Sequence, residues 1–176
     1  AVDIPDREFE AVNVEGTRNV LDACARSSVA RVVHASTIGV YGDGSVGDGG
    51  RIDEQTPPSP RNVYERTKLE GEQVALFYQD RVPLSVVRIS EAYGPGDQRL
   101  LKLFRMTSRG LFFLVGEGEN LHHPIYVDDV IRGLKAAAST PAAVDEVVLL
   151  AGKEPVTTND MAEMVADAVG EPPPKL

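Results

Sequence analysis

The stretch Arg31-Val-Val-His-Ala-Ser36, followed by Thr37-Ile-Gly-Val-Tyr-Gly42, decides the fold. Its first six residues form a largely apolar run, which predicts a buried strand over 31–36. Two further apolar runs, Leu84–Ser90 and Glu146–Ala151, predict strands of the same kind. Because these runs are continuously apolar and do not alternate with polar residues, they are typical of a parallel sheet that is covered on both faces.

Helical patterns separate the predicted strands. Apolar and small residues recur at helical spacing from Phe9 to Cys24, which predicts a helix over about 7–27. Strands that alternate with helices indicate an α/β fold with a doubly wound parallel sheet. The remaining expected elements are helices over 61–79 and 99–109, a helix that opens at Asp128-Asp129, a short strand at 112–115, turns at 93–96 and 116–118, and a last helix that begins with the Thr157 and Asp160 capping pattern and ends at Gly170.

Composition limits the classes of partner. The chain has 176 residues, 42% of them hydrophobic, which suits one globular domain with room for a small appendage. Its 18 basic and 27 acidic residues give a net charge of −9, which repels phosphate backbones, so no nucleic-acid partner is expected. No apolar run approaches the roughly 20 residues of a membrane-spanning helix. Cys24 is the single cysteine, so no internal disulfide forms, and we expect a cytoplasmic protein.

A loop is predicted over 42–61, and loops of that length in compact domains usually have a task such as covering a site. Gly42, Gly44 and Gly47 in this loop match the G-x-G-x-x-G pattern of dinucleotide-binding turns. That turn works only when a helix opens directly behind it, because the N-terminus of the helix holds the pyrophosphate. Here Asp48 and two more glycines follow, so we reject this match as the dinucleotide loop.

Tyr64 and Lys68 stand at positions i and i+4 of the predicted helix over 61–79, and therefore on one face. A free tyrosine has a pKa of roughly 10 and is a poor base at neutral pH. A nearby ammonium stabilises the phenolate and lowers that pKa. Such a pair exchanges a proton with a substrate hydroxyl while hydride moves to or from a nicotinamide.

Four other segments accompany this pair in a fixed order, and together they resemble the extended short-chain dehydrogenase/reductase family, the NAD-dependent epimerase/dehydratase group. The resemblance covers almost the whole chain, and the segments are Asn13–Val20, Ser36–Gly42, Arg88–Gly96 and His123–Val130. It implies a partial Rossmann sheet with a small C-terminal substrate-binding subdomain. Residues 1–98 would belong to the Rossmann domain and 99–176 mainly to the subdomain, with the strand at 146–151 returning to the sheet.

The resemblance also implies roles for single residues. Thr37, Tyr64 and Lys68 would be catalytic, with Thr37 also binding the substrate oxygen and Lys68 also holding the nicotinamide ribose. The implied cofactor is NAD, with NADP left open. The implied cofactor contacts are Asn13, Ser36, Tyr64, Lys68 and Ile89, and the implied substrate contacts are Thr37, Glu91 and His122.

Three departures from the family pattern bear on the substrate. Glu91 stands where the family commonly has Asn, and His122 stands where many nucleotide-sugar enzymes have Arg. The first change adds negative charge and the second removes positive charge, so both disfavour a diphosphate. The family's 4,6-dehydratases have Asp-Glu where this chain has Ile38-Gly39, so we do not expect water elimination. The His122-His123 pair has no further ligand at metal-binding spacing, so no metal is expected.

The resemblance implies two properties of assembly. Because the chain begins at Ala1 without Met and shows no glycine loop, we expect a section before residue 1 that carries this loop and four more strands. Without it, the strand at 31–36 would have an open edge, and the chain alone would aggregate, bind NAD(P) poorly and show no turnover. Family members often dimerise through two helices, so we expect a homodimer through the helices near 7–27 and 61–79.

Three functional hypotheses follow. The first is an NAD(P)-dependent epimerase or related oxidoreductase that acts on a sugar or nucleotide-sugar hydroxyl. The second is a carbonyl reductase or hydroxyl dehydrogenase with a non-nucleotide substrate, which would show net turnover of added cofactor, whereas an epimerase returns the hydride. The third is a non-catalytic, cofactor-sensing protein, and the intact set of Thr37, Tyr64 and Lys68 argues against it.

Overall fold

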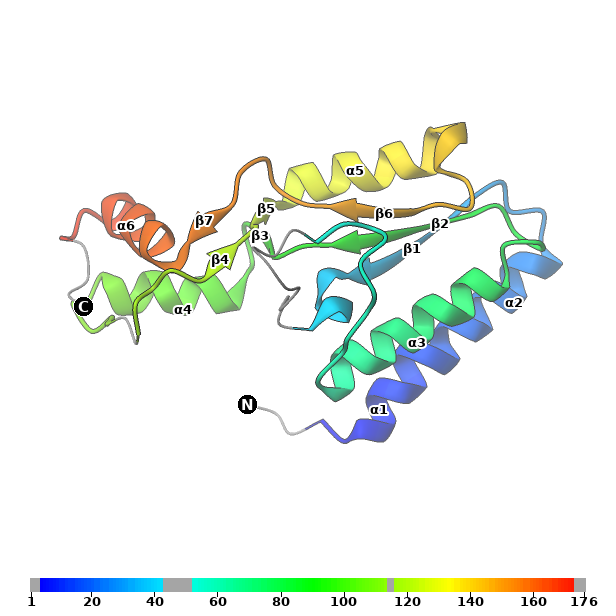
Figure 1. The fold of residues 1–176 in the computed structure, drawn as a ribbon, viewed down its shortest axis with the longest axis horizontal. Coiled ribbons are helices and arrows are strands. Elements are labelled where there is room, and N and C mark those ends of the chain that lie inside the picture. The colour runs from blue at the N-terminus through cyan, green and yellow to red at the C-terminus, as the bar shows by residue number, and fades with distance from the viewer. Residues whose placement is uncertain (1–3, 43–51, 114–115, 173–176) are drawn as a thin grey trace. The chain divides into compact units, whose positions relative to one another are not determined.

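The computed structural model describes residues 4–42, 52–113 and 116–172, which divide into two compact units (Figure 1). The first unit holds the chain up to Ser90 together with Val130–Leu150, and the second holds Glu91–Asp129 and the chain from Ala151 onward. Residues 91–98, which the sequence grouped with the Rossmann domain, therefore belong to the second unit. Gly44 and Gly47 of the rejected glycine pattern, and the last two residues of the predicted strand at 112–115, lie outside the described residues.

The first unit contains a parallel sheet of three strands within its described residues. These are β1 (Val32–Thr37), β2 (Leu84–Ile89) and β6 (Val147–Leu150), in the spatial order β1-β2-β6. Val32 pairs with Leu84, and Val86 with Val147. The three predicted main strands are thus confirmed. The central strand β2 is almost completely buried, as its continuous apolar run requires.

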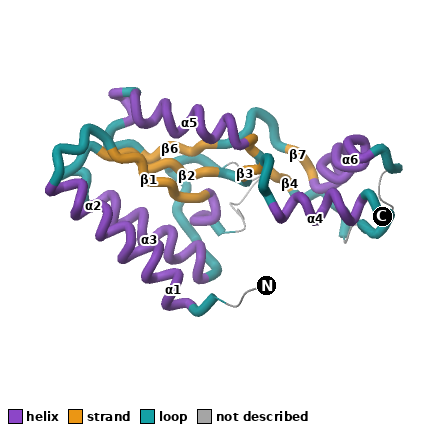
Figure 2. The backbone as a smooth tube through the Cα atoms, turned by 180° about the vertical axis from the view of Figure 1, so that it is seen from behind, coloured by secondary structure: helices purple, strands orange, loops and turns teal. Residues whose placement is uncertain are grey.

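Helices cover both faces of this sheet, which confirms the doubly wound arrangement (Figure 2). One face carries α2 (Gly16–Arg26) and α3 (Val63–Phe77), whereas the other carries α5 (Val127–Ser139) from Val130 onward. On the α5 side, Gly133 packs so closely on β6 that a side-chain carbon there would lie 2.5 Å from Leu150. The core on the α2–α3 side comprises Leu21, Ala75, Tyr78, Leu84 and Val86.

The single helix predicted over 7–27 is wrong in one detail. It is observed as α1 (Asp6–Glu10), a π-helical turn η1 (Ala11–Glu15) and then α2, with helical backbone at both junctions. The wide turn places Asn13 against α3, where a side-chain carbon on Gly71 would lie 2.3 Å from the Asn13 main-chain oxygen. The two helices approach this closely only because residue 71 has no side chain. Such π-turns are frequent at functional sites.

The second unit is built from short elements. Two strand pairs, the parallel pair β3 (Ala92–Tyr93) with β5 (Ile125–Tyr126) and the antiparallel pair β4 (Leu121–His122) with β7 (Val156–Thr157), accompany α4 (Gln98–Thr107) and α6 (Thr158–Val169). The predicted capping box of Thr157 with Asp160 and the left-handed C-cap at Gly170 are confirmed. Residues 111–113 are not in a strand, so the strand predicted at 112–115 is wrong over its described part.

A buried ion pair fixes α3 to the sheet. The carboxylate of Glu72 on α3 accepts two hydrogen bonds from Arg88 on β2, one of them from Nε to Oε2 at 3.1 Å. The Ser36 hydroxyl donates to the same Oε2 at 2.8 Å. Arg88 Nη1 donates to the Tyr41 hydroxyl at 2.6 Å, and this hydroxyl donates to the main-chain oxygen of Asp53 at 2.8 Å. Both charged side chains are almost fully buried, and the sequence analysis missed this network.

His34 lies on β1, on the strand face that Ser36 shares, because side chains alternate along a strand. Its Nε2 is buried without a hydrogen-bond partner among the described residues. Burial, the larger cause, and the positive charge of Lys68 together lower the pKa of His34 to about 4, although the negative charge of Glu72 partly opposes both. The imidazole is therefore neutral in the folded protein at neutral pH.

The ion pair predicts an asymmetric response to mutation. Arg88→Met alone leaves the buried Glu72 carboxylate without its partner, so the free energy of unfolding should fall by about 3–5 kcal/mol. Glu72→Leu combined with Arg88→Met removes both charges and should cost less than the single change. Urea denaturation followed by circular dichroism measures this. Arg66→Met is the matched control, because Arg66 pairs with Glu70 on the exposed side of the same helix and should change stability little. Equal losses for Arg66 and Arg88 would contradict the assignment.

His34 predicts a pH dependence of stability. The unfolded chain takes up a proton on this imidazole near pH 6.5, whereas the folded protein does so only near pH 4. As the pH falls between these values, the unfolded state binds the extra proton, so the free energy of unfolding falls by something on the order of 3 kcal/mol and levels off below pH 4. The free energy of unfolding of the wild type minus that of His34→Gln should therefore fall by something on the order of 3 kcal/mol through this window, since the carboxylates titrate alike in both. A difference that stays constant would show that His34 is not the cause.

Candidate active site

Tyr64 stands in the first turn of α3. The helix begins there because the Asn62 side chain accepts a hydrogen bond from the Glu65 main-chain nitrogen at 3.0 Å, and the Glu65 carboxylate accepts one from the Arg61 main chain at 2.7 Å. The Tyr64 side chain is 44% exposed. Its ring meets Phe9 edge-on, with the ring centroids 6.4 Å apart. The ring thus has a packing contact on α1, while a large part of the residue stays exposed.

Lys68 lies one helical turn further on, on the same face as Tyr64. Its Nζ donates a hydrogen bond to the main-chain oxygen of Ala35 on β1 at 2.7 Å. Burial lowers the pKa of the Lys68 ammonium, and the carboxylate of Glu72 partly opposes this. An ammonium has three donors, and Ala35 accepts from one of them. The others fit ribose hydroxyls, and the positive charge favours a phenolate nearby.

Thr37 is the last residue of β1 and follows Ala35, whose main-chain oxygen binds Lys68, by two residues. Its Oγ1 accepts a hydrogen bond from the Gly39 main chain at 3.1 Å and thereby caps the short 3-10 helix η2 (Ile38–Tyr41). A side-chain carbon on Gly39 would lie 3.3 Å from the Glu65 side chain, so η2 packs against the first turn of α3. The segment that carries Thr37 therefore meets the turn that carries Tyr64.

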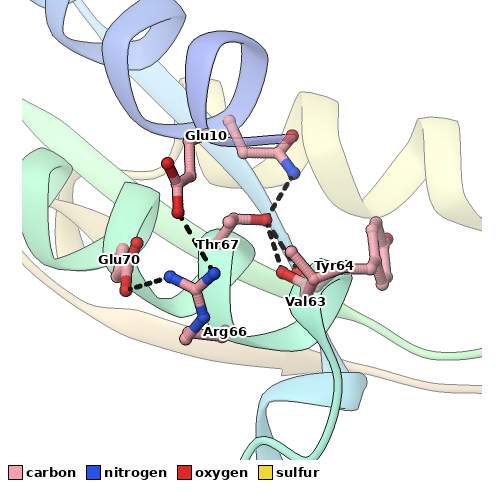
Figure 3. Close-up of polar contacts among 7 residues, drawn as sticks. Glu10, Val63, Tyr64, Arg66, Thr67 and Glu70 are labelled. Carbon is pink, nitrogen blue, oxygen red and sulfur yellow. Dashed lines mark hydrogen bonds and ion pairs between the residues drawn. The ribbon is translucent and has the colours of Figure 1, made fainter. Parts of the chain in front are cut away.

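Asn13 supports the first turn of α3, which carries Tyr64, through Thr67. Its Nδ2 donates to the Thr67 hydroxyl at 2.9 Å, and this hydroxyl donates in turn toward the main-chain oxygens of Val63 at 2.8 Å and Tyr64 at 3.1 Å (Figure 3). Figure 3 also shows that the Tyr64 ring points away from the group formed by Arg66 and its two glutamates. Since Nδ2 of Asn13 uses one of its two N–H donors on Thr67, the predicted cofactor contact of Asn13 would fall to its Oδ1 or to the second N–H.

The two other predicted cofactor residues lie at the same end of the sheet. Ile89 on β2 is the register partner of Thr37. Ser36 faces the opposite side of β1 from Thr37, because neighbouring side chains alternate along a strand. Its hydroxyl is buried and donates to Glu72. The structure thus places Ser36 inside the network that holds α3.

Glu91 and His122, the predicted substrate contacts, are direct neighbours in the second unit. Nδ1 of His122 lies 3.1 Å from both carboxylate oxygens of Glu91, and Nε2 lies 3.0 Å from the hydroxyl of Thr158. In a neutral ring whose Nδ1 donates to the carboxylate, Nε2 accepts from Thr158. The sequence analysis missed Thr158, whose only signal was its place beside the capping residue of α6. Glu91 and His122 line a pocket of about 440 Å³ within this unit.

Two further observations concern the described part of the chain. None of its helices is long and apolar enough to cross a membrane. Across residues 4–42, 52–113 and 116–172, no group of three or more His, Cys, Asp or Glu side chains gathers in a way that could hold a metal ion.

Comparison with known proteins gives the context of this site. The chain is 27% identical to an uncharacterized UDP-glucose epimerase of Bacillus subtilis over 92% of this chain and 52% of that protein. It is 34% identical to 3beta-hydroxysteroid-dehydrogenase/decarboxylase isoform 1 of Arabidopsis thaliana, over 78% of this chain and 32% of that protein.

The fold likewise has relatives among solved structures. The UDP-glucuronic acid 4-epimerase from Bacillus cereus, solved in complex with UDP-glucuronic acid and NAD, matches with a TM-score of 0.81 and 28% identity, over 94% of this chain and 54% of that one. The chain thus spans about half the length of these two epimerases and about a third of the length of the Arabidopsis protein. The model of one family, the NAD dependent epimerase/dehydratase family, matches residues 3–152. Because the family model matches most of its length and the similar proteins include epimerases, the chain belongs to the NAD-dependent epimerase/dehydratase family.

Proposed function

We propose that the protein is an NAD-dependent epimerase or related oxidoreductase that transfers hydride at a hydroxyl-bearing carbon of a sugar or sugar derivative. One observation carries the proposal: Lys68, which shares a helix face with Tyr64, donates a hydrogen bond to the main-chain oxygen of Ala35 on β1. Ala35 precedes Thr37 by two residues. The chemistry of this donor set fits a nicotinamide ribose, because the ammonium keeps donors for its hydroxyls. The family to which the chain belongs supports NAD as the cofactor.

The residues divide the work of the reaction. NAD, when bound, supplies the carrier for the hydride. Tyr64 takes the proton of the substrate hydroxyl and later returns it, and Thr37 holds the reacting oxygen by a hydrogen bond. Lys68 binds the ribose and places its positive charge on the helix face that it shares with Tyr64. Asn13 and Thr67 keep the backbone of the Tyr64 turn in place behind the reacting group.

A second candidate is a hydroxyl dehydrogenase with a non-nucleotide substrate. It is supported by the pairing of His122 with the Glu91 carboxylate, because this pairing places negative charge where a diphosphate would need positive charge. The steroid dehydrogenase/decarboxylase relative from Arabidopsis acts on a substrate of that kind by its name. Net formation of NADH separates the two candidates, since an epimerase returns the hydride to its substrate. The set of Thr37, Tyr64 and Lys68 counts against a non-catalytic protein.

The helices α2 and α3 also support the proposed homodimer. Apolar side chains are exposed along their outer surfaces, namely Val12 on η1, Val20 on α2 and Phe77 on α3. A second copy that packs its own helix pair against this surface would bury them in a four-helix bundle, which is a two-fold arrangement.

The dimer proposal predicts the effect of one charge. Light scattering should give a dimeric mass for the wild type at micromolar concentration, and Phe77→Asp should shift it toward the monomer because a carboxylate would be buried without a partner. Phe113→Asp is the matched control, since Phe113 is 67% exposed, compared with 76% for Phe77, and belongs to the second unit. A monomeric wild type, or a Phe77→Asp variant that stays dimeric, would refute the interface.

The catalytic assignment predicts the effect of one hydroxyl. Tyr64→Phe in the full-length protein should reduce turnover about 10²–10⁴-fold, because the positioned proton-transfer group is lost, while calorimetric binding of NAD stays nearly unchanged. Lys68→Ala should reduce both turnover and NAD binding, because Lys68 serves Tyr64 and the ribose. Tyr126→Phe removes the hydroxyl of another partly exposed tyrosine and should retain wild-type activity. Wild-type turnover by Tyr64→Phe would reject Tyr64 as the acid/base.

A further inference from the structure

The pocket of about 440 Å³ in the second unit has the size of a small-ligand site. Its walls are largely apolar: Leu100 and Phe104 come from α4, and Met161, Met164 and Val165 come from α6. Methionine side chains are flexible and polarisable, so they adapt to irregular apolar surfaces. The pocket therefore favours contact with apolar ligand groups over most of its wall.

The charges at this pocket oppose a polyanion. Two carboxylates line it, Glu91 and Asp97, and the single guanidinium among its described lining residues is that of Arg99. Arg99 is engaged already: Nε lies 3.2 Å from Asp97 Oδ1, and Nη2 lies 3.3 Å from Asp97 Oδ2 and 2.9 Å from the Ala92 main-chain oxygen. The two carboxylates thus outnumber the one guanidinium in this lining. A diphosphate is held by free, often bidentate cations, and this lining does not offer them.

One edge of the pocket is polar and ordered. His122 is held between the Glu91 carboxylate and the Thr158 hydroxyl, so its ring orientation is fixed from both nitrogens. The Glu91 side chain remains partly exposed and keeps acceptor capacity for a hydroxyl or amide of a ligand. An apolar cavity with one polar edge suits a ligand that is apolar over most of its surface and carries a hydrogen-bonding group at one end.

We propose that the pocket of the second unit binds an uncharged, largely apolar part of the substrate and that it excludes a nucleoside diphosphate. The inference rests on the proposed function for one point, that the ligand also carries the hydroxyl to be oxidised. It narrows that function by naming the substrate class, an uncharged molecule such as a glycoside with an apolar aglycone. The apolar lining, the excess of carboxylates over guanidinium groups and the engaged Arg99 all point to the same class.

Binding by the full chain without cofactor tests the proposal. The uncharged fluorophore N-phenyl-1-naphthylamine should bind with micromolar affinity and be displaced by octyl glucoside below its micellar concentration, but not by UDP-glucose. Met164→Asp should lower the affinity for the fluorophore by about tenfold or more, because a carboxylate would face the apolar ligand. Leu111→Asp is the matched control, since Met164 and Leu111 are both 61% exposed and Leu111 does not line the pocket.

A charge exchange supplies the opposite arm of the test. Glu91→Asn combined with His122→Arg removes a carboxylate and adds a guanidinium, so UDP-glucose should gain about tenfold or more in affinity while fluorophore binding, which depends mainly on the apolar wall, should change far less. Displacement of the fluorophore by UDP-glucose from the wild type overturns the proposal, and so does a fluorophore affinity that Met164→Asp leaves unchanged. These readouts need neither NAD nor turnover. An inactive protein would therefore count against the proposed function alone, and a pocket that takes UDP-glucose would count against this inference alone.

Discussion

The bidentate pair between Glu72 and Arg88 is the interaction on which the geometry of the first unit depends. The catalytic candidates sit on two different elements, Tyr64 and Lys68 on α3 and Thr37 at the end of β1, so the helix must keep one position along the sheet. A hydrophobic interface alone tolerates small shifts of a helix, whereas a buried carboxylate and guanidinium lose their partners as soon as the register changes. Ser36 and Tyr41 extend the same network to β1 and η2. The network thus specifies where α3 lies more than it adds to stability.

The opposite side of α3 is fixed by a close approach of backbones. Gly71 lets the main chain of Asn13 come against the helix, and the amide of Asn13 reaches Thr67 in the turn that follows Tyr64. Helix α3 is therefore held from the sheet by charge and from the N-terminal helix by backbone contact and one hydrogen bond. The backbone under Tyr64 is held by these contacts although its side chain is partly exposed, and a proton-transferring group needs such support if it is to meet a substrate at a set distance.

The sequence predicted the parts of this structure that periodicity and local chemistry control. The runs at Leu84 and Glu146 became strands because apolar side chains have to be buried, and Thr157 capped α6 because its hydroxyl satisfies a free helix donor. The two-residue strands of the second unit are too short to show any period. The π-turn at Asn13 depends on packing against Gly71, and the pairing of Glu72 with Arg88 joins residues whose contact exists only in the folded chain. The neighbours of Glu91 and His122 were missed for the same reason, although both residues had been singled out.

The two units carry different kinds of information about function. In the first, Thr37, Tyr64 and Lys68 are the proposed catalytic residues, so they bear on the reaction and leave the substrate open. A UDP-glucose epimerase and a steroid dehydrogenase/decarboxylase resemble this chain at 27% and 34% identity, which shows that overall similarity does not select between their substrates. Selection has to come from groups that contact the part of the substrate that does not react. In the pocket proposed to bind the substrate, those groups would be an apolar wall, a guanidinium that already has a partner and a histidine held by a carboxylate, and each of them disfavours a diphosphate through its own local contacts.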